Sequence, residues 1–165
     1  MITYKVGDLI AAATDPSNDY VVVAHCCNCF NTMKSGIAPQ IAKAFPEAYQ
    51  IDQLTTRGDK VKLGDLTEAW SANNNVLVYN LYGQYGFFGR REGKRDLDYV
   101  ALEHSLHKMA LSLHSKCRLM DLNPSELNVF LPKIGAGLAG GDWAIISEII
   151  EKRLGAFNVT VFTLK

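Results

Sequence analysis

The fold is organised around the segment 131-LPKIGAGLAGGDW-143, which contains four glycines within seven residues. The apolar run from Val129 to Ile134 predicts a buried strand, and the pattern that opens at Asp142 predicts a helix. Glycine allows positive φ and a close approach of backbone N–H groups to a ligand. The start of a helix adds unpaired N–H groups and a positive dipole end. Strand, glycine turn and helix start together predict a phosphate-binding site.

The spacing Gly135-x-Gly137-x-x-Gly140 also matches the dinucleotide fingerprint of Rossmann domains. That fold needs a second strand about 20 residues later that ends in an acidic residue. Residues 155–165 lie at that distance and contain no Asp or Glu. We therefore exclude a Rossmann domain, and a P-loop as well, because no Lys-Ser/Thr pair follows the glycines. The structural alternative is a tight strand-to-helix connection without a ligand.

Length and composition are those of one globular domain, which we predict over residues 1–165. The formal net charge is zero, so nothing suggests nonspecific attraction to nucleic acid or to an anionic membrane. No apolar run approaches the ~20 residues of a membrane span, and the N-terminal MITYKVGDL lacks the apolar region of a signal peptide. Three of the four cysteines crowd into residues 26–29, which favours a reduced, cytoplasmic chain over a disulfide scaffold.

Predicted strands alternate with predicted helices along the chain. The strands are expected at residues 2–6, 20–25, 76–82, 129–134 and 158–164, with 61–70 either a strand pair or one strand broken at Gly64-Asp65. The helices are expected at 9–13, from Ile37 to Phe45 with a restart at Pro46, from Leu97 to Cys117, and from Asp142 onward. This order predicts an α/β fold with helices on both faces of a mixed sheet. Because ligands bind beyond the carboxyl ends of such strands, the loops 26–35, 83–95 and 135–141 should share one cleft.

The segment 25-HCCNC-29 follows a predicted strand and contains a Cys-x-x-Cys pair next to a histidine. A closed zinc site needs four ligands, usually as two separated pairs. The remaining candidates form no second pair: Cys117, His104, His107 and His114. A redox pair would have a helix directly behind it, and none is predicted there. We therefore expect no metal.

His25 and Asn28 are the candidate functional side chains of this segment. An imidazole transfers a proton near neutral pH or attacks phosphorus directly. An amide side chain binds a sugar hydroxyl through both its donor and its acceptor. The alternative for His25 is a buried structural histidine at the end of a strand.

Together these segments resemble the macrodomain family, which binds ADP-ribose. The resemblance runs over nearly the whole chain and is carried by 2-ITYKVGDL-9, 21-VVVAHCCNCFNTMKSGIAPQIAKAFPEA-48, 79-YNLYGQYGFFG-89, 131-LPKIGAGLAGGDW-143 and 158-NVTVFTLK-165. The most similar branch is that of the yeast-type ADP-ribose 1″-phosphate phosphatases, whose His-x-Cys-Asn-Cys stretch resembles residues 25–29. A related branch removes ADP-ribose from acidic side chains of proteins. The resemblance implies a three-layer α/β/α fold with a mixed, mostly parallel central sheet.

The resemblance also implies a role for individual residues. Asp8 is expected to accept from the adenine amino group, with Leu9 beside it and Leu164 on the ring. The distal ribose is expected against Cys26, Asn28, Ser35, Gly36, Ile37, Ala38, Gln84 and Tyr85. The diphosphate is expected against the backbone N–H groups of Gly135 to Gly141, and the ligand-binding residues of this segment are Ile134, Gly135, Ala136, Gly137, Leu138, Ala139 and Gly140. His25 and Asn28 are the implied catalytic residues, with no cofactor and no metal.

Two features depart from the family pattern. The branch that acts on proteins uses a lysine in the third loop and an aspartate in the glycine loop, where this chain has Gly83 or Gln84, and Ala139. The triple glycine that commonly precedes the first long helix is reduced to 34-KSG-36. Lys34 could offer a cation to a terminal phosphate, or be an ordinary solvated lysine.

The implied function is removal of phosphate from ADP-ribose 1″-phosphate. The alternatives are hydrolysis of acyl- or base-linked ADP-ribose conjugates, in which case ADP-ribosylated macromolecules are partners, and ADP-ribose binding without turnover. Nucleic-acid binding remains a further alternative through the basic residues of the third loop, which are otherwise a solvated run: Arg90, Arg91, Lys94 and Arg95.

Overall fold

The computed structural model describes residues 1–164, so that Lys165 of the predicted domain lies outside the described residues. Its centre is a six-stranded sheet in the order β1-β6-β5-β2-β4-β3. The strands are β1 (Thr3–Val6), β2 (Val21–Cys26), β3 (Leu66–Ser71), β4 (Val76–Leu81), β5 (Asn128–Leu131) and β6 (Asn158–Thr163). Only the β3–β4 pair is antiparallel among these strands. The prediction of a mixed, mostly parallel sheet is confirmed.

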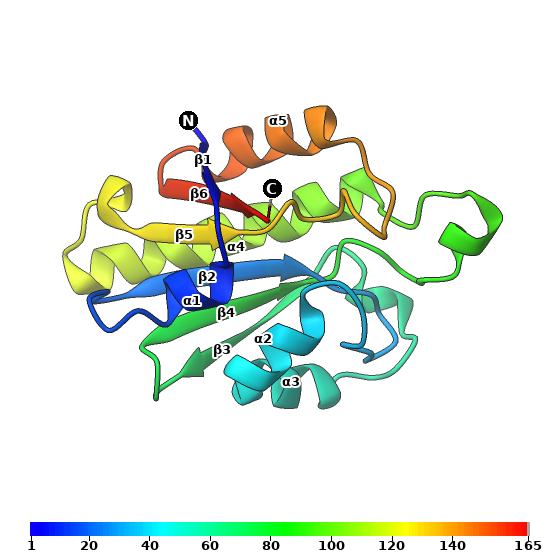
Figure 1. The fold of residues 1–165 in the computed structure, drawn as a ribbon, viewed down its shortest axis with the longest axis horizontal. Helices are drawn as coiled ribbons and strands as arrows, with labels where there is room; N and C mark the ends of the chain where they lie inside the picture. Colours follow the sequence, from blue (N-terminus) through cyan, green and yellow to red (C-terminus); the bar gives the residue numbers. More distant parts are fainter. Residues whose placement is uncertain (165) are drawn as a thin grey trace.

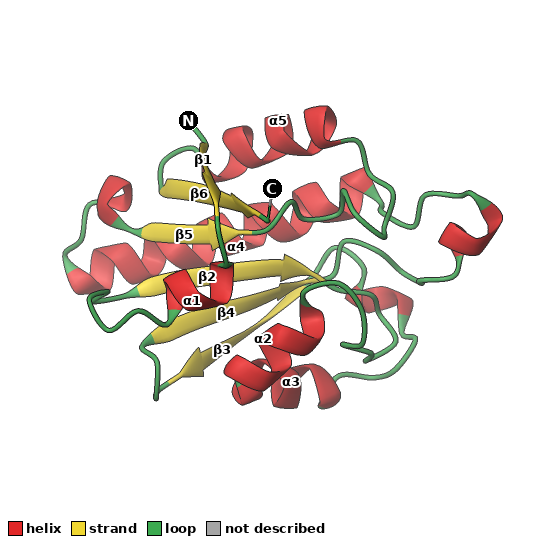
Figure 2. Ribbon diagram, viewed as in Figure 1, coloured by secondary structure: helices red, strands yellow, loops and turns green. Residues whose placement is uncertain are grey.

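Helices cover both faces of the sheet and complete a three-layer α/β/α arrangement (Figures 1 and 2). One face carries α1 (Leu9–Ala13), α2 (Ala38–Ala44) and α3 (Pro46–Gln53), and the other carries α4 (Tyr99–Met120) and α5 (Trp143–Leu154). Three short 3-10 turns lie in the connections: η1 (Lys60–Lys62), η2 (Gly89–Glu92) and η3 (Pro124–Glu126).

The central strand β2 shows why the sequence folds this way. Its residues Val21 to Ala24 are fully buried, and the side chains alternate between the two faces. Val22 and Ala24 pack in the core beneath α4 and α5, whereas Val21 and Val23 pack beneath α1 to α3. A strand that is covered on both faces must be apolar at every position, which explains the continuous apolar run.

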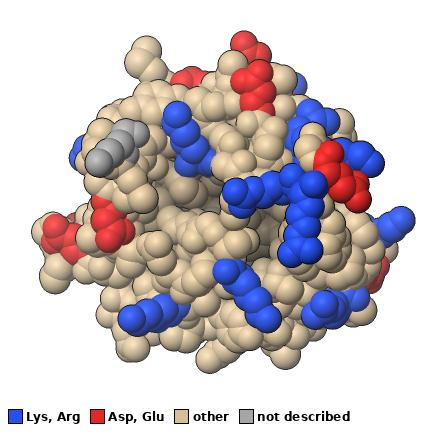
Figure 3. Space-filling model, turned by 45° about the vertical axis from the view of Figure 1, so that its right-hand side comes forward, with Lys and Arg blue, Asp and Glu red and all other residues tan. Residues whose placement is uncertain are grey.

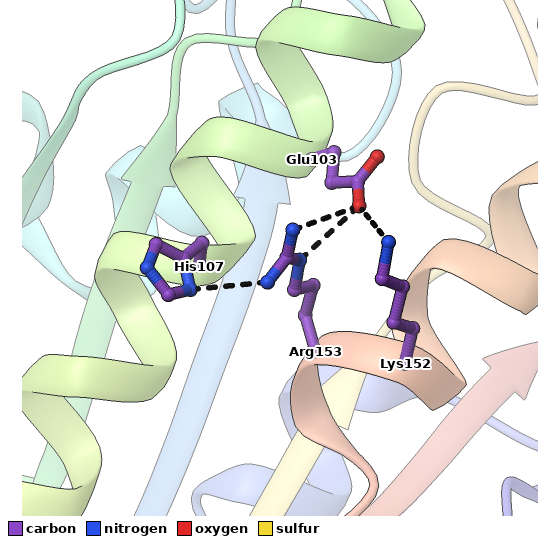
Figure 4. A network of polar contacts seen from close by, with 4 residues as sticks. All are labelled: Glu103, His107, Lys152 and Arg153. Atoms are coloured by element: carbon purple, nitrogen blue, oxygen red, sulfur yellow. Dashed lines mark hydrogen bonds and ion pairs between the residues drawn. The ribbon is translucent and has the colours of Figure 1, made fainter.

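Aspartates at the helix starts fix where three of the helices begin. The carboxylates of Asp8, Asp98 and Asp142 accept hydrogen bonds from N–H groups in the first turns of α1, α4 and α5. Pro46 occupies the first position of α3, so the proline that was predicted to restart the helix does so. On the outer surface, Glu103 of α4 binds Lys152 and Arg153 of α5 (Figure 4).

Two predicted strands were wrong in extent. Within residues 61–70 only the part from Leu66 onward is strand, because residues 60–62 form η1 behind the capping side chain of Asp59. Strand β5 ends at Leu131 rather than Ile134, since Pro132 has no N–H group to continue the sheet. In the part of the chain that the structure describes, no helix has both the length and the apolar character to cross a membrane.

Candidate functional site

A cavity of about 410 Å³ opens at the carboxyl ends of β2, β4 and β5. All three loops that were predicted to share a cleft contribute to its lining, which is His25, Cys26, Cys27, Asn28, Thr32, Ser35, Gly36, Ile37, Ala38, Gln84, Phe87, Arg90, Arg91, Asp96, Pro132, Lys133, Ile134, Gly135, Gly137, Leu138 and Ala139. The volume lies within the usual range for small-molecule sites. Figure 3 shows a hollow on this side of the molecule with Lys and Arg side chains around it.

The glycine segment offers backbone N–H groups to the cavity. Four of the described residues between Gly135 and Gly141, the glycine segment, line the cavity with N–H groups that donate to no protein acceptor: Gly135, Gly137, Leu138 and Ala139. Gly135 has φ of 71°, and an added Cβ would lie 2.8 Å from the side chain of Leu97, so only glycine fits there. Such a run of free N–H groups is suited to a phosphate group.

The predicted contribution of the α5 start to this site is not seen. The lining ends at Ala139, three residues before the cap of α5. The Asp142 carboxylate accepts from Ala144 N at 2.9 Å, and therefore already places a negative charge at that helix end. The N–H of Gly141 is also used, because it donates to Gly135 O at 2.7 Å. The glycine segment alone provides the N–H groups.

The opposite wall comes from the loop after β2 and the start of α2. Within the described residues, the N–H groups of Ser35, Gly36 and Ile37 donate to no protein acceptor. The Asn28 side chain is engaged within its own loop, since Oδ1 accepts from Phe30 N and Nδ2 donates to Thr32 Oγ1, both at 2.8 Å. Nδ2 also donates to Thr32 O at 3.4 Å, so Asn28 holds the loop in shape, and one lone pair of Oδ1 remains for a ligand.

His25 reaches the cavity wall from the last part of β2, but its side chain is almost enclosed at 1% exposure. Nε2 lies 2.6 Å from Oδ1 of Asn80, which is its register partner on β4. The Asn80 amide group donates to Ala48 O and to Thr67 Oγ1, so its Oδ1 must accept and the imidazole carries its proton on Nε2. Burial lowers the pKa of His25 to about 4, and the imidazole is therefore neutral near pH 7 with a lone pair on Nδ1.

The cysteines of this segment point to different surroundings. Cys26 lines the cavity with Gln84, whereas Cys29 is fully buried and donates to the backbone oxygen of Gln84 at 3.5 Å. All four cysteines are free thiols. Within residues 1–164 no three His, Cys, Asp or Glu side chains are grouped as ligands for a metal ion.

Thirteen of the residues expected to bind the ligand or act on it line the cavity, and six do not. The six are Asp8, Leu9, Tyr85, Ala136, Gly140 and Leu164. Asp8 caps α1, Leu9 is buried, and Leu164 is 80% exposed. The hydroxyl of Tyr85 donates to Gly58 O, so its ring belongs to the outer loop cluster. Lys34 does not line the cavity either. The protein-directed branch is expected to have a lysine at Gly83 or Gln84 and an aspartate at Ala139, and of these Gln84 and Ala139 line the cavity.

Sequence reasoning missed eight lining residues: Cys27, Thr32, Phe87, Arg90, Arg91, Asp96, Pro132 and Lys133. The signal for the arginines was present, because the glycine-rich loop after β4 concentrates basic residues. It was interpreted as a solvated run or a nucleic-acid surface, since no pattern shows which of four cations turns inward.

Comparison with known proteins gives relatives over the full chain. No family model matches the sequence. An uncharacterized 17.5 kDa protein in the tk-vs intergenic region of Enterobacteria phage T4 is 32% identical over 164 residues, which cover 98% of this chain and 95% of that protein. An ADP-ribose 1″-phosphate phosphatase of Debaryomyces hansenii is 27% identical over 171 residues, which cover 92% and 93% of the two chains.

Solved structures share the fold. A protein of unknown function from Bacteroides thetaiotaomicron superposes with a TM-score of 0.80 at 26% identity, covering 98% of this chain and 97% of that one. A macrodomain protein from Streptomyces coelicolor gives a TM-score of 0.64 at 25% identity over 99% of both chains. Thermosipho africanus DarTG, solved in complex with ADP-ribose, gives 0.70 at 14% identity over 98% of this chain and 41% of that one.

Proposed function

This chain belongs to the macrodomain family, and on that premise we propose that it forms a single macrodomain that binds ADP-ribose and removes the terminal phosphate from ADP-ribose 1″-phosphate. The products are ADP-ribose and inorganic phosphate. The phosphatase relative from Debaryomyces hansenii supports this choice of reaction.

The observation that carries the proposal is one cavity with two different walls. The glycine segment supplies free N–H groups at Gly137 to Ala139, which are suited to the diphosphate. The facing wall supplies His25 and Asn28, where the distal ribose and its phosphate would lie. Positioning of the phosphate against fixed dipoles accounts for most of the rate in phosphoryl transfer.

The state of His25 favours one of its two chemical roles. A neutral imidazole that donates from Nε2 to Asn80 has no proton to give from Nδ1, so it is suited to act as a nucleophile or base rather than as a general acid. Attack by Nδ1 would form a nitrogen–phosphorus bond and break the bond between phosphorus and the ribose oxygen, which would leave as a hydroxyl with a proton taken from water. Water would then release phosphate from the imidazole and restore the free enzyme.

The direct test is a calorimetric titration with ADP-ribose together with phosphate detection on ADP-ribose 1″-phosphate. The expected result is saturable binding at one site and release of one phosphate per substrate. Binding without phosphate release would remove the catalytic part of the proposal. No binding at all would remove both parts.

A non-catalytic ADP-ribose-binding module is the second candidate. The enclosure of His25 favours it, because a side chain at 1% exposure has little access to substrate. Parallel assays with protein-linked and base-linked ADP-ribose separate this candidate from a hydrolase of conjugates. Ala139 and Gln84 offer neither the aspartate nor the lysine of the protein-directed branch, so we expect no release from acidic side chains.

A further inference from the structure

Arg90 and Arg91 are the two basic residues of η2 that line the cavity. Both are exposed, and within residues 1–164 neither has a carboxylate within 4.0 Å. The other two cations of the same loop are already engaged. Lys94 pairs with Glu92 at 3.2 Å, and the Arg95 guanidinium lies 4.0 Å from the centre of the Tyr99 ring. In the described residues the loop thus presents two arginines without an ion-pair partner to the cavity, and the Asp96 carboxylate that also lines the cavity accepts from Gly89 N.

The turn that carries these arginines is held by hydrogen bonds at its base. Gly89 N donates to Asp96 Oδ1 at 2.9 Å, and Lys94 N donates to Gly89 O at 2.8 Å. A Cβ at Gly89 would lie 2.7 Å from Asp96 Oδ1, so this approach requires glycine. Gly93 closes the turn with φ of 68°. Both arginines therefore lie on a defined turn.

The same loop is joined to the glycine segment. The N–H groups of Asp96 and Leu97 both donate to Ala139 O, at 2.9 and 3.1 Å. Ala139 is the last lining residue of the segment that offers its N–H groups to the cavity. The arginines and the expected diphosphate site are therefore held in a fixed relation to each other.

The sheet order places the arginines at one end of the site. The loop that carries them follows β4, which lies beyond β2 on the side away from β5 and β6. Asp8 and Leu164, where adenine is expected, lie near the carboxyl ends of β1 and β6. A ligand that extends from adenine across the glycine segment would bring its distal ribose into the part of the cavity between the loop after β2 and the loop that carries Arg90 and Arg91.

We propose that Arg90 and Arg91 form a binding subsite for the phosphate monoester on the distal ribose, and that they select ADP-ribose 1″-phosphate over ADP-ribose; this inference rests on the proposed function. A guanidinium group binds phosphate through two parallel hydrogen bonds, and these are stronger than bonds between neutral groups. Unmodified ADP-ribose ends in a neutral hydroxyl at this position and gains nothing from the pair.

The test compares two double variants that lose the same charge. Arg90→Gln/Arg91→Gln removes the lining pair, and Lys94→Gln/Arg95→Gln removes two cations of the same loop that do not line the cavity. For each protein the KM for ADP-ribose 1″-phosphate is measured from initial rates, and the Kd for ADP-ribose by calorimetry. Thermal unfolding checks that both variants are folded.

We expect Arg90→Gln/Arg91→Gln to raise the KM for ADP-ribose 1″-phosphate about tenfold or more, because charge-assisted hydrogen bonds to phosphate are lost. In the same variant the Kd for ADP-ribose should change less than about twofold. In Lys94→Gln/Arg95→Gln both the KM and the Kd should change less than about twofold. An equal rise in KM in both double variants would overturn the inference, because it would show that the overall positive charge of the loop acts rather than contacts of Arg90 and Arg91. An equal loss of affinity for ADP-ribose and for its 1″-phosphate in Arg90→Gln/Arg91→Gln would also overturn the inference, because it would place the arginines at the diphosphate that both ligands share.

The inference and the proposed function fail in different ways. If the wild-type protein releases no phosphate, the 1″-phosphate is an unreacted ligand, and calorimetry with both ligands still gives the ratio of affinities. Tighter binding of the 1″-phosphate than of ADP-ribose, with this preference lost only in Arg90→Gln/Arg91→Gln, would support the subsite without the phosphatase activity. Loss of binding to a single-stranded oligonucleotide, with both ADP-ribose ligands unaffected, would overturn the subsite and favour a nucleic-acid surface.

Discussion

The two faces of the sheet are filled with different kinds of side chain. Beneath α4 and α5 the buried cluster is almost entirely aliphatic and aromatic, with Leu102, Leu106 and Met109 fully enclosed. Beneath α1 to α3 the cluster is apolar near the start of β2, but polar near its end, where His25 and Asn80 lie side by side. The apolar cluster reaches the cavity only at its edge, through Ile134 and Ala139, whereas the polar end borders the cavity with His25.

The polar end is a continuous chain of hydrogen bonds. It runs from His25 to Asn80, from Asn80 to Thr67, and from Thr67 through Tyr82 to Asp52. Each buried polar group in such a chain is costly unless its partner is present. The apolar face therefore mainly provides stability, whereas the other face uses part of its core to orient one imidazole.

The largest expected effect is on the rate. His25→Ala should reduce phosphate release by about a thousandfold, the usual scale for loss of a nucleophile or base, while the Kd for ADP-ribose stays within about threefold. Val23→Ala is the matched control, because it lies on the same strand and face but two residues from the cavity wall. Comparable kcat values for wild type and His25→Ala would remove His25 from the mechanism.

On the apolar face the expected effect is on stability alone. Leu106→Ala opens a space in a fully buried position and should lower the free energy of unfolding by about 2–5 kcal/mol. Leu111→Ala on the exposed side of the same helix should cost less than about 0.5 kcal/mol. Urea unfolding measures both. A large loss of ADP-ribose affinity in folded Leu106→Ala would show that the two faces are not separate in function.

Acid should lower the free energy of unfolding through His25 at the polar end of the core. The folded pKa of His25, about 4, lies below its ordinary value of 6.5, so the unfolded chain takes up this proton first. The stability linked to His25 is therefore present above pH 6.5 and lost as the pH falls toward 4, by up to about 3 kcal/mol. Free energies of unfolding at several pH values in this window should fall more steeply for wild type than for His25→Gln. Parallel profiles would contradict the assigned burial.

The smallest expected effect lies on the outer surface of the apolar face. Glu103 accepts from Lys152 and Arg153, and Arg153 also contacts His107 (Figure 4). These side chains are partly exposed, so Glu103→Gln should cost less than about 1 kcal/mol. The difference should shrink between about 0.05 and 0.5 M salt, because salt screens exposed charges. A cost that is independent of salt would indicate packing rather than charge.

The sequence predicted the fold well wherever a local rule decided the structure. The continuous apolar runs placed β2 and β4 to within one residue at each end, and Pro46 marked the start of α3. Residues 60–62 were missed because Val61 suggested a strand, whereas the Asp59 cap and the turn at Gly64 impose a 3-10 turn. An apolar residue in a short segment does not distinguish the two.

The site was predictable in its backbone and less so in its side chains. Strand ends predicted which loops share the cavity, because parallel strands bring their carboxyl ends to one edge. Two features depend on contacts between distant segments, and no local pattern contains them. They are the pairing of His25 with Asn80, 55 residues later, and the inward turn of Arg90 and Arg91.

The crowded thiols beside the cavity have a practical consequence. Burial raises the pKa of Cys26 to about 12 and that of Cys29 to about 11, and it raises the pKa of Cys27 well above its ordinary value. Only the thiolate reacts with iodoacetamide or peroxide, and almost none is present at neutral pH. The native protein should therefore withstand air and alkylating agents, and its cysteines should become labelled only as the chain unfolds.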